Sequence, residues 1–271
     1  DRIGMERLGF SDVQQEMLRE AIRASNGIVL VTGPTGSGKS TTLYSLLEIL
    51  NDPSKNIITL EDPVEFTIAG LTQIQINERI GLTFGSALRS ILRQDPDIIM
   101  VGEIRDTETA HLAVRVALTG HLVLSTLHTN DAPTAINRLV DMGVPRFLLA
   151  SSLRAVLAQR LVRSLCPHCR ERLYVNAAME AETGIPEGTA VYGPKGCPEC
   201  RFTGYKGRTV IAEVMMIDNT LRAMINDGAS EQELRDYARR FGMITLREDA
   251  RRKVEEGVTS IDEMLFTTII D

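Results

Sequence analysis

The chain has 271 residues, 43% of them hydrophobic, so it is long enough for one large α/β domain plus a smaller unit. Its net charge of −6, its 4% aromatic content and its lack of tryptophan argue against a general nucleic-acid-binding surface. No apolar run approaches the ~20 residues of a membrane-spanning helix, so we expect no direct membrane insertion. The chain opens on Asp1-Arg2-Ile3 without an initiator methionine, and we therefore expect a fragment of a longer protein.

Apolar β-branched runs and segments with helical spacing alternate along the chain. The runs predict buried strands, and the spaced segments predict helices between them. Strands are expected at 27–32, 56–60, 71–76, 97–101, 121–126 and 208–217, and helices at 11–23, 43–50, 83–93 and 107–118. From Ala132 to the first cysteine pair the pattern predicts helix, and helices are expected again after 217. This alternation predicts an α/β fold with a mostly parallel sheet.

A glycine-rich loop lies between the first strand and the next helix. It fits the G-x-x-x-x-G-K-[ST] phosphate-binding template and comprises Gly33, Pro34, Thr35, Gly36, Ser37, Gly38, Lys39, Ser40 and Thr41. Glycines let the backbone N–H groups curl around phosphates, Lys39 supplies a cation, and the Ser40 hydroxyl supplies a ligand for Mg²⁺. The loop predicts a RecA-like P-loop NTPase core that binds ATP with Mg²⁺.

Three predicted strands end in reactive groups, and in such sheets ligands bind beyond the carboxyl ends of the strands. Glu103 is our first choice for a Mg²⁺-associated carboxylate or for the general base. Glu61 is the second choice for activating water, and Glu65 is a weaker one. His128 is predicted to sense the γ-phosphate. The alternative for each is a structural side chain or a solvated charge at a strand end.

Phosphoryl transfer also needs cations against the developing charge. Lys39 is one of them. Further arginines surround the two acidic motifs, and three are predicted to contact nucleotide, some across a subunit boundary: Arg79, Arg93 and Arg105.

All four cysteines fall into two C-x-x-C pairs, Cys166 with Cys169 and Cys197 with Cys200. A P-loop enzyme works where ATP is, in the reducing cytosol, so structural disulfides are not expected. The paired spacing predicts a structural Zn²⁺ site, because four thiolates close a tetrahedral coordination sphere. Redox dithiols or four metal-free thiols are the alternatives.

The motifs, taken in order, resemble the C-terminal motor of ATPases of the type II secretion and type IV pilus superfamily. They are the P-loop, the acidic box at 58–65, the second acidic segment at 92–106 and the histidine box at 119–130. The tetracysteine unit resembles the secretion and pilus-extension branches, called GspE-like and PilB-like. The segments 157–169 and 204–209 look closer to GspE-like proteins.

The resemblance implies a homo-hexameric, Mg²⁺-dependent ATPase in the cytoplasm, peripheral at the inner membrane, that powers type II protein secretion. Its partners would be inner-membrane platform proteins, contacted mainly through absent N-terminal domains, and not nucleic acid. A type IV pilus-extension ATPase is the alternative, and a DNA-translocating or type IV secretion ATPase, or a scaffold that hydrolyses ATP poorly, are further ones. The expected units are an ATPase core at 1–165, a zinc-binding unit at 166–207 and a mainly helical subdomain at 208–271.

Overall fold

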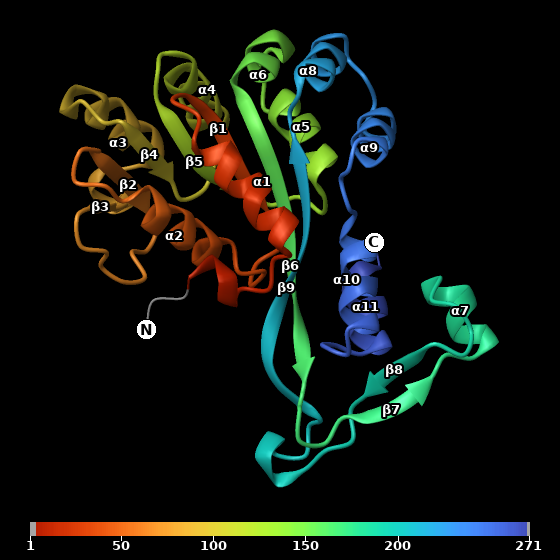
Figure 1. The fold of residues 1–271 in the computed structure, drawn as a ribbon. Coiled ribbons are helices and arrows are strands. Elements are labelled where there is room, and N and C mark those ends of the chain that lie inside the picture. Colours follow the sequence, from red (N-terminus) through yellow and green to blue (C-terminus); the bar gives the residue numbers. More distant parts are fainter. Residues whose placement is uncertain (1–3, 270–271) are drawn as a thin grey trace.

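A seven-stranded sheet forms the centre of the computed structural model, which describes residues 4–269 and so leaves Asp1-Arg2-Ile3 outside (Figure 1). The strand order is β3-β2-β4-β5-β1-β6-β9, and only the β6–β9 pair within it is antiparallel. The strands are β1 (Gly27–Thr32), β2 (Ile57–Glu61), β3 (Thr72–Gln75), β4 (Ile98–Val101), β5 (Leu122–Leu127), β6 (Leu153–Leu165) and β9 (Tyr205–Met216). The predicted α/β fold with a mostly parallel sheet is confirmed.

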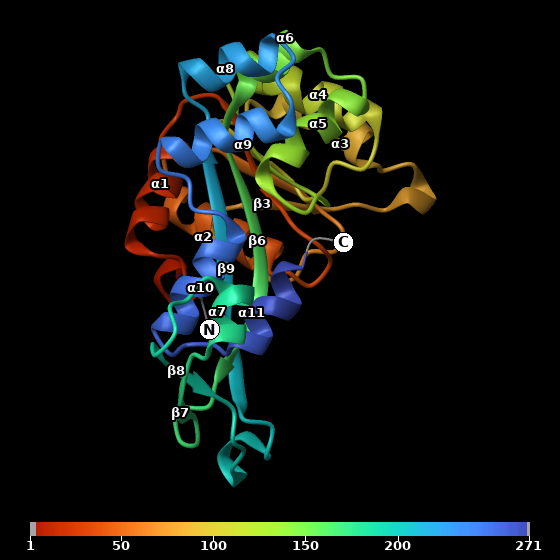
Figure 2. The same cartoon turned by 90° about the vertical axis from the view of Figure 1, so that its right-hand side faces the viewer.

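Helices cover both faces of this sheet, as Figure 2 shows. The helices α1 (Asp12–Ile22) and α2 (Lys39–Leu50) lie on one face, and α3 (Phe84–Ile91), α4 (Thr107–Leu118), α5 (Ala132–Asp141) and α6 (Arg146–Ser152) lie on the other. Side chains of a strand alternate between the two faces of the sheet. Val29 and Val31 of β1 therefore pack in the core on the α1–α2 face, while Ile28 and Leu30 pack in the core on the opposite face. Strands buried on both sides explain the continuous apolar runs.

The expectation of helix from Ala132 to the first cysteine pair is wrong in its second half. The helices α5 and α6 end at Ser152, and the chain then forms β6, the longest strand of the described sheet. This strand pairs with β1 on one side and β9 on the other, so it is buried on both faces over much of its length. A buried apolar run has no alternation, so its periodicity does not separate strand from helix.

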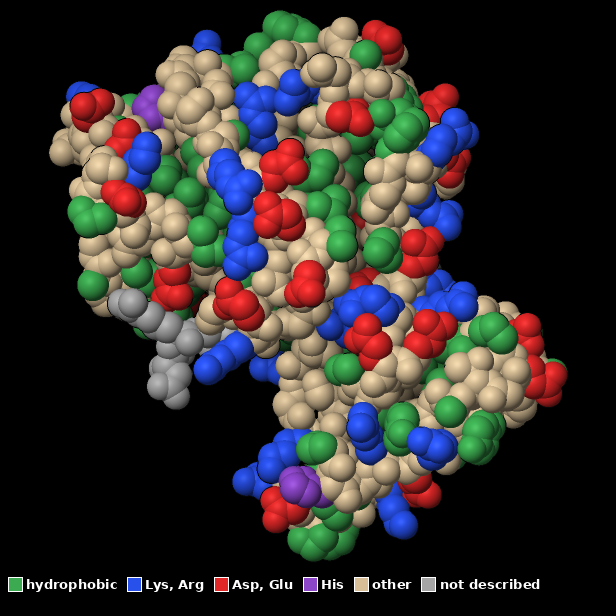
Figure 3. Space-filling view, in the orientation of Figure 1, with side chains coloured by type: hydrophobic (Ala, Val, Ile, Leu, Met, Phe, Trp, Pro, Cys, Tyr) green, Lys and Arg blue, Asp and Glu red, His purple; other side chains and the backbone are tan. Residues whose placement is uncertain are grey.

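Beyond the sheet, β6 and β9 continue as a two-stranded ribbon into the segment 166–204, here called the cysteine arm (Figure 1). The cysteine arm holds β7 (Glu171–Tyr174), α7 (Ala177–Thr183), β8 (Ala190–Gly193) and the short 3₁₀ helix η4 (Pro198–Cys200). On the face that Figure 3 shows, acidic and basic side chains are interspersed over both the main body and this narrower projection.

In the described part of the chain, four helices follow β9: α8 (Asn219–Asn226), α9 (Glu231–Arg240), α10 (Leu246–Glu255) and α11 (Ile261–Thr268). This confirms the helical C-terminal part. Helices α10 and α11 pack against the β6–β9 ribbon, and Glu263 of α11 pairs with Arg163 of β6 at 2.7 Å. The division into three units stays a prediction, although β6 and β9, on either side of the middle unit, share one sheet. Within residues 4–269, none of the helices combines the length and apolar character that a bilayer crossing requires.

Candidate nucleotide and metal sites

The carboxyl ends of β1, β2, β4 and β5 meet at a cleft of about 470 Å³. Loop residues after β1 line one wall, and the strand-end residues Glu61, Glu103 and His128 line another. The β6–β9 ribbon closes a third side with Leu161 and Arg208. A parallel α/β sheet binds its ligands at this edge, so the fold brings the predicted groups to the expected place.

The glycine-rich loop leads directly into α2. Gly38 stands immediately before the helix with φ +86°, a left-handed conformation that L side chains rarely adopt. Ser40 and Thr41 follow it in the first turn, exposed to the cleft. Backbone N–H groups at a helix start favour an anion, so this geometry suits a phosphate.

Lys39 lies between the loop and the strand ends. Its ammonium Nζ donates to the carbonyl oxygens of Gly33 at 2.7 Å and Pro34 at 3.0 Å, and lies 3.4 Å from His128 Nδ1. Burial lowers the pKa of Lys39 below its ordinary value, while the charge of Glu103 acts in the opposite direction. The lysine is thus a cation held at the phosphate loop, within the field of a carboxylate.

Glu103 is held from two sides. One carboxylate oxygen, Oε1, lies 2.8 Å from His128 Nε2, and the other accepts a hydrogen bond of 2.7 Å from Arg105 Nε. Arg105 also reaches Asp62 at 3.3 Å, and its pKa is raised chiefly by the Glu103 hydrogen bond. The structure therefore brings together the two strand-end groups that the sequence predicted separately, with an arginine beside them.

Glu61 has a different setting. It is buried, and its oxygens accept hydrogen bonds from Tyr44 Oη, from Thr59 Oγ1 at 2.6 Å and from Gln73 Nε2 at 3.1 Å. Burial first, and then the bond to Glu61, raise the pKa of Tyr44 to about 12. Since three donors already hold its oxygens, Glu61 is better suited to orient α2 and β3 than to activate water.

The arginines divide into those that line the cleft and those that do not. Arg105 lines the cleft, as does Arg208, for which the sequence predicted no role. Arg79, in the 3₁₀ helix η2 (Glu78–Ile80), and Arg93, in η3 (Leu92–Gln94), are absent from the described lining of the cleft. Their contact with nucleotide stays a prediction.

Sequence reasoning also missed Tyr44 and Gln159. Tyr44 lies in α2 and bonds Glu61, and Gln159 lies in β6 and bonds Ser37 and Thr42 of the loop and helix. Each of these side chains contacts residues of the site that are distant in the sequence, so no motif of adjacent residues marks it. Its place directly after the apolar run 155–158 was the one available signal for Gln159.

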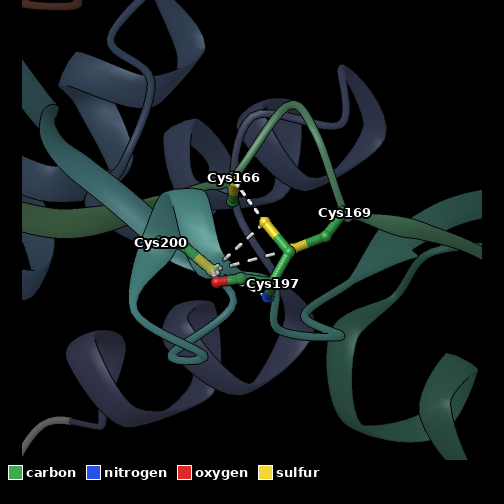
Figure 4. A group of neighbouring side chains, drawn as sticks. All are labelled: Cys166, Cys169, Cys197 and Cys200. Carbon is green, nitrogen blue, oxygen red and sulfur yellow. Dashed lines mark hydrogen bonds between the residues drawn. The ribbon is translucent and has the colours of Figure 1, made fainter.

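The four cysteines converge at the base of the cysteine arm (Figure 4). Their sulfur atoms lie within 4.8 Å of one another, with Sγ–Sγ distances of 3.9 Å for Cys166–Cys197 and 3.8 Å for Cys169–Cys200 and Cys197–Cys200. A tetrahedral Zn²⁺ with bonds of about 2.3 Å requires sulfurs about 3.8 Å apart, so the donor set fits this ion.

Backbone groups support the same assignment. The N–H groups of Gly196, Cys197 and Gly204 donate to cysteine sulfurs at 3.2–3.3 Å. Such donors stabilise thiolates, the form in which cysteine binds metal. The residues can therefore hold a structural zinc ion, which would tie the end of β6 to the start of β9.

Comparison with known proteins adds a family. The family described as "Type II/IV secretion system protein" matches residues 2–266. Type II secretion system protein E of Pseudomonas aeruginosa is 51% identical over 269 residues, which cover 98% of this chain and 53% of that protein. Type IV pilus assembly ATPase PilB of Myxococcus xanthus is 50% identical over 277 residues, covering 100% of this chain and 49% of that protein.

A solved structure agrees with the fold. The pilus retraction motor PilT with bound ADP superposes with a TM-score of 0.75 at 29% identity, covering 100% of this chain and 68% of that one. The chain spans about half the length of the curated relatives it matches.

Proposed function

Since the chain belongs to the type II/IV secretion system protein family, we propose that it is the motor part of an Mg²⁺-dependent ATPase that powers type II protein secretion. The carrying observation is the position of Glu103, held by His128 and Arg105 at the strand edge that faces the glycine-rich loop. A nucleotide whose phosphates lie on that loop would present its terminal phosphate toward Glu103.

Each residue has a part in the proposed hydrolysis. The loop N–H groups and Lys39 bind the phosphates, and the exposed hydroxyl of Ser40 would hold Mg²⁺. The ion, when bound, neutralises the charge that develops on the phosphate oxygens. Glu103 orients or deprotonates the attacking water, and His128 reports the presence of the terminal phosphate through its contact with Glu103.

Arg105 and Arg208 supply positive charge at the mouth of the cleft. Developing negative charge in phosphoryl transfer is stabilised by such guanidinium groups, which bind phosphate oxygens bidentately. Arg79 and Arg93 are proposed to serve a neighbouring subunit, in keeping with their absence from the described lining of this cleft.

Two cellular roles fit the relatives about equally, because the secretion and pilus proteins are 51% and 50% identical to this chain. We propose type II secretion first, with a type IV pilus ATPase as the second candidate. The proposed assembly is a homo-hexamer on the cytoplasmic side of the inner membrane, docked on platform proteins. Restoration of secretion, but not of pilus extension, by the full-length protein in strains lacking each ATPase would decide between them.

The activity itself is tested by phosphate release from ATP with Mg²⁺, comparing the full-length protein with Glu103→Gln. Loss of a general base reduces turnover by about 10²- to 10⁴-fold, whereas nucleotide binding should persist. Glu16→Gln, a change at an exposed glutamate of α1, is the matched control and should keep wild-type turnover. Equal turnover in Glu103→Gln and wild type would remove Glu103 from the proposed role.

A further inference from the structure

Gln159 lies where β6 runs past the end of β1. The parallel register of the two strands ends at Thr32 and Ala158, and β1 then turns into the glycine-rich loop while β6 continues straight. Gln159 is therefore the first residue of β6 beside the loop. Its side chain is fully buried, and a buried amide must find hydrogen-bond partners.

Both ends of the amide are engaged. Its Nε2 donates to the carbonyl oxygen of Ser37 at 2.8 Å, and its Oε1 accepts from Thr42 Oγ1 at 2.7 Å. Ser37 lies in the glycine-rich loop and Thr42 in the first turn of α2. One side chain thus connects the two segments that would surround the phosphates.

The bond to Ser37 has a directional consequence. A trans peptide is planar, so the carbonyl of Ser37 and the N–H of Gly38 point in opposite directions. Because Gln159 holds that carbonyl from the β6 side, the Gly38 N–H is directed away from β6. Gly38 lines the cleft, so the anchoring aims one of the loop N–H groups at the position of a bound phosphate.

Two loop glycines make room for this strand. A Cβ atom at Gly33 would lie 2.4 Å from the Gln159 carbonyl oxygen, and one at Gly38 would lie 3.1 Å from Gln159 Nε2. Their lack of a side chain therefore serves the approach of Gln159 as well as the phosphate cradle.

We propose that Gln159 is a positioning residue for the nucleotide: its amide holds the glycine-rich loop and the start of α2 in the geometry that binds phosphate. The inference rests on the proposed function. Gln159 touches no nucleotide itself, since it acts through Ser37 and Thr42.

The test compares Gln159→Met with wild type in the full-length protein, by titration with a fluorescent ATP analogue and by thermal unfolding. Methionine keeps the length of the side chain and removes both hydrogen bonds, and we expect the Kd to rise about tenfold or more. Gln14→Met is the matched control. Gln14 is also a buried glutamine with two hydrogen bonds, to Ala212 O and from Ser11 N, but it lies outside the cleft.

The control separates positioning from stability. The two variants should lose similar thermal stability, while only Gln159→Met loses affinity and Gln14→Met stays within about twofold of wild type. Thr42→Val covers the case in which Gln159→Met does not fold. It removes the bond to Gln159 Oε1, keeps the size of the side chain and should also weaken binding.

Wild-type affinity in folded Gln159→Met, or in Thr42→Val where Gln159→Met does not fold, overturns the inference, as does an equal loss in the Gln14→Met control. Lys39→Ala tests the proposed function in the same titration. If wild type binds and Lys39→Ala does not, an unchanged Gln159→Met refutes the positioning role alone. If wild type itself fails to bind ATP, the proposed function fails and the positioning role with it.

Discussion

The hydroxyl group of Tyr44 offers a sharp test of the buried network around Glu61. It donates to the Glu61 carboxylate and accepts from the Glu65 N–H at 3.0 Å. Tyr44→Phe removes this group and keeps the ring, which packs edge-to-face on Phe66 with 4.6 Å between centroids. The substitution therefore isolates two hydrogen bonds.

The magnitude follows from the two bonds. A hydrogen bond to a charged group contributes about 1.5–3 kcal/mol and a neutral one about 1 kcal/mol, so their loss should cost about 3 kcal/mol. For a chain of this size, the melting temperature should fall by roughly 6–12 °C.

The pH dependence has a definite sign. The folded-state pKa of Tyr44 is raised, so the stabilisation is complete below pH 10 and is lost as pH rises from about 10 to about 12. Urea unfolding of wild type and Tyr44→Phe at several pH values measures this. The difference in unfolding free energy should be about 3 kcal/mol at pH 8 and should shrink over that alkaline range. A difference below about 0.5 kcal/mol at pH 8 would show that these two bonds do not stabilise the fold.

Two further predictions concern the cysteine arm and strand β9. Cys197→Ser should abolish stoichiometric zinc in elemental analysis, and it should raise hydrogen exchange across 166–207 while the glycine-rich loop stays protected. The reason is that metal binding supplies folding energy to such a unit. Wild-type protein without zinc would contradict the proposed metal site. Burial raises the pKa of Glu213, which accepts from the N–H groups of Ala132 and Leu246, from 4.5 to about 6. Wild type should therefore lose about 2 kcal/mol relative to Glu213→Gln as pH rises through that range, measured by urea unfolding, and parallel pH profiles would contradict it.

The sequence predicted what is local. The glycine-rich loop, the two cysteine pairs and the groups at the ends of β2, β4 and β5 are each marked by a few adjacent residues whose chemistry is distinctive. Parallel strands place their carboxyl ends together, so the meeting of Glu103 and His128 followed from the fold class.

What the sequence did not predict depends on pairing between distant segments. β6 was expected to be helical, because its apolar run has no alternation and its strand character comes from pairing with both β1 and β9. The contacts of Gln159 and Arg208 with the site follow from that topology, whereas the contact of Tyr44 joins α2 to the end of β2. No spacing along the chain relates Gln159 to Ser37, which is 122 positions away.

Glu103 is proposed to drive the conversion of bound ATP into ADP and phosphate. A single-turnover experiment measures this step. Full-length Glu103→Gln, in slight excess over ATP, is mixed with the nucleotide, and samples are quenched with acid at increasing times. The amounts of ATP and ADP in each sample are then compared with those for wild type. The variant should bind ATP and still hold it as ATP when wild type has converted it to ADP. Formation of ADP by Glu103→Gln at the wild-type rate would contradict this role.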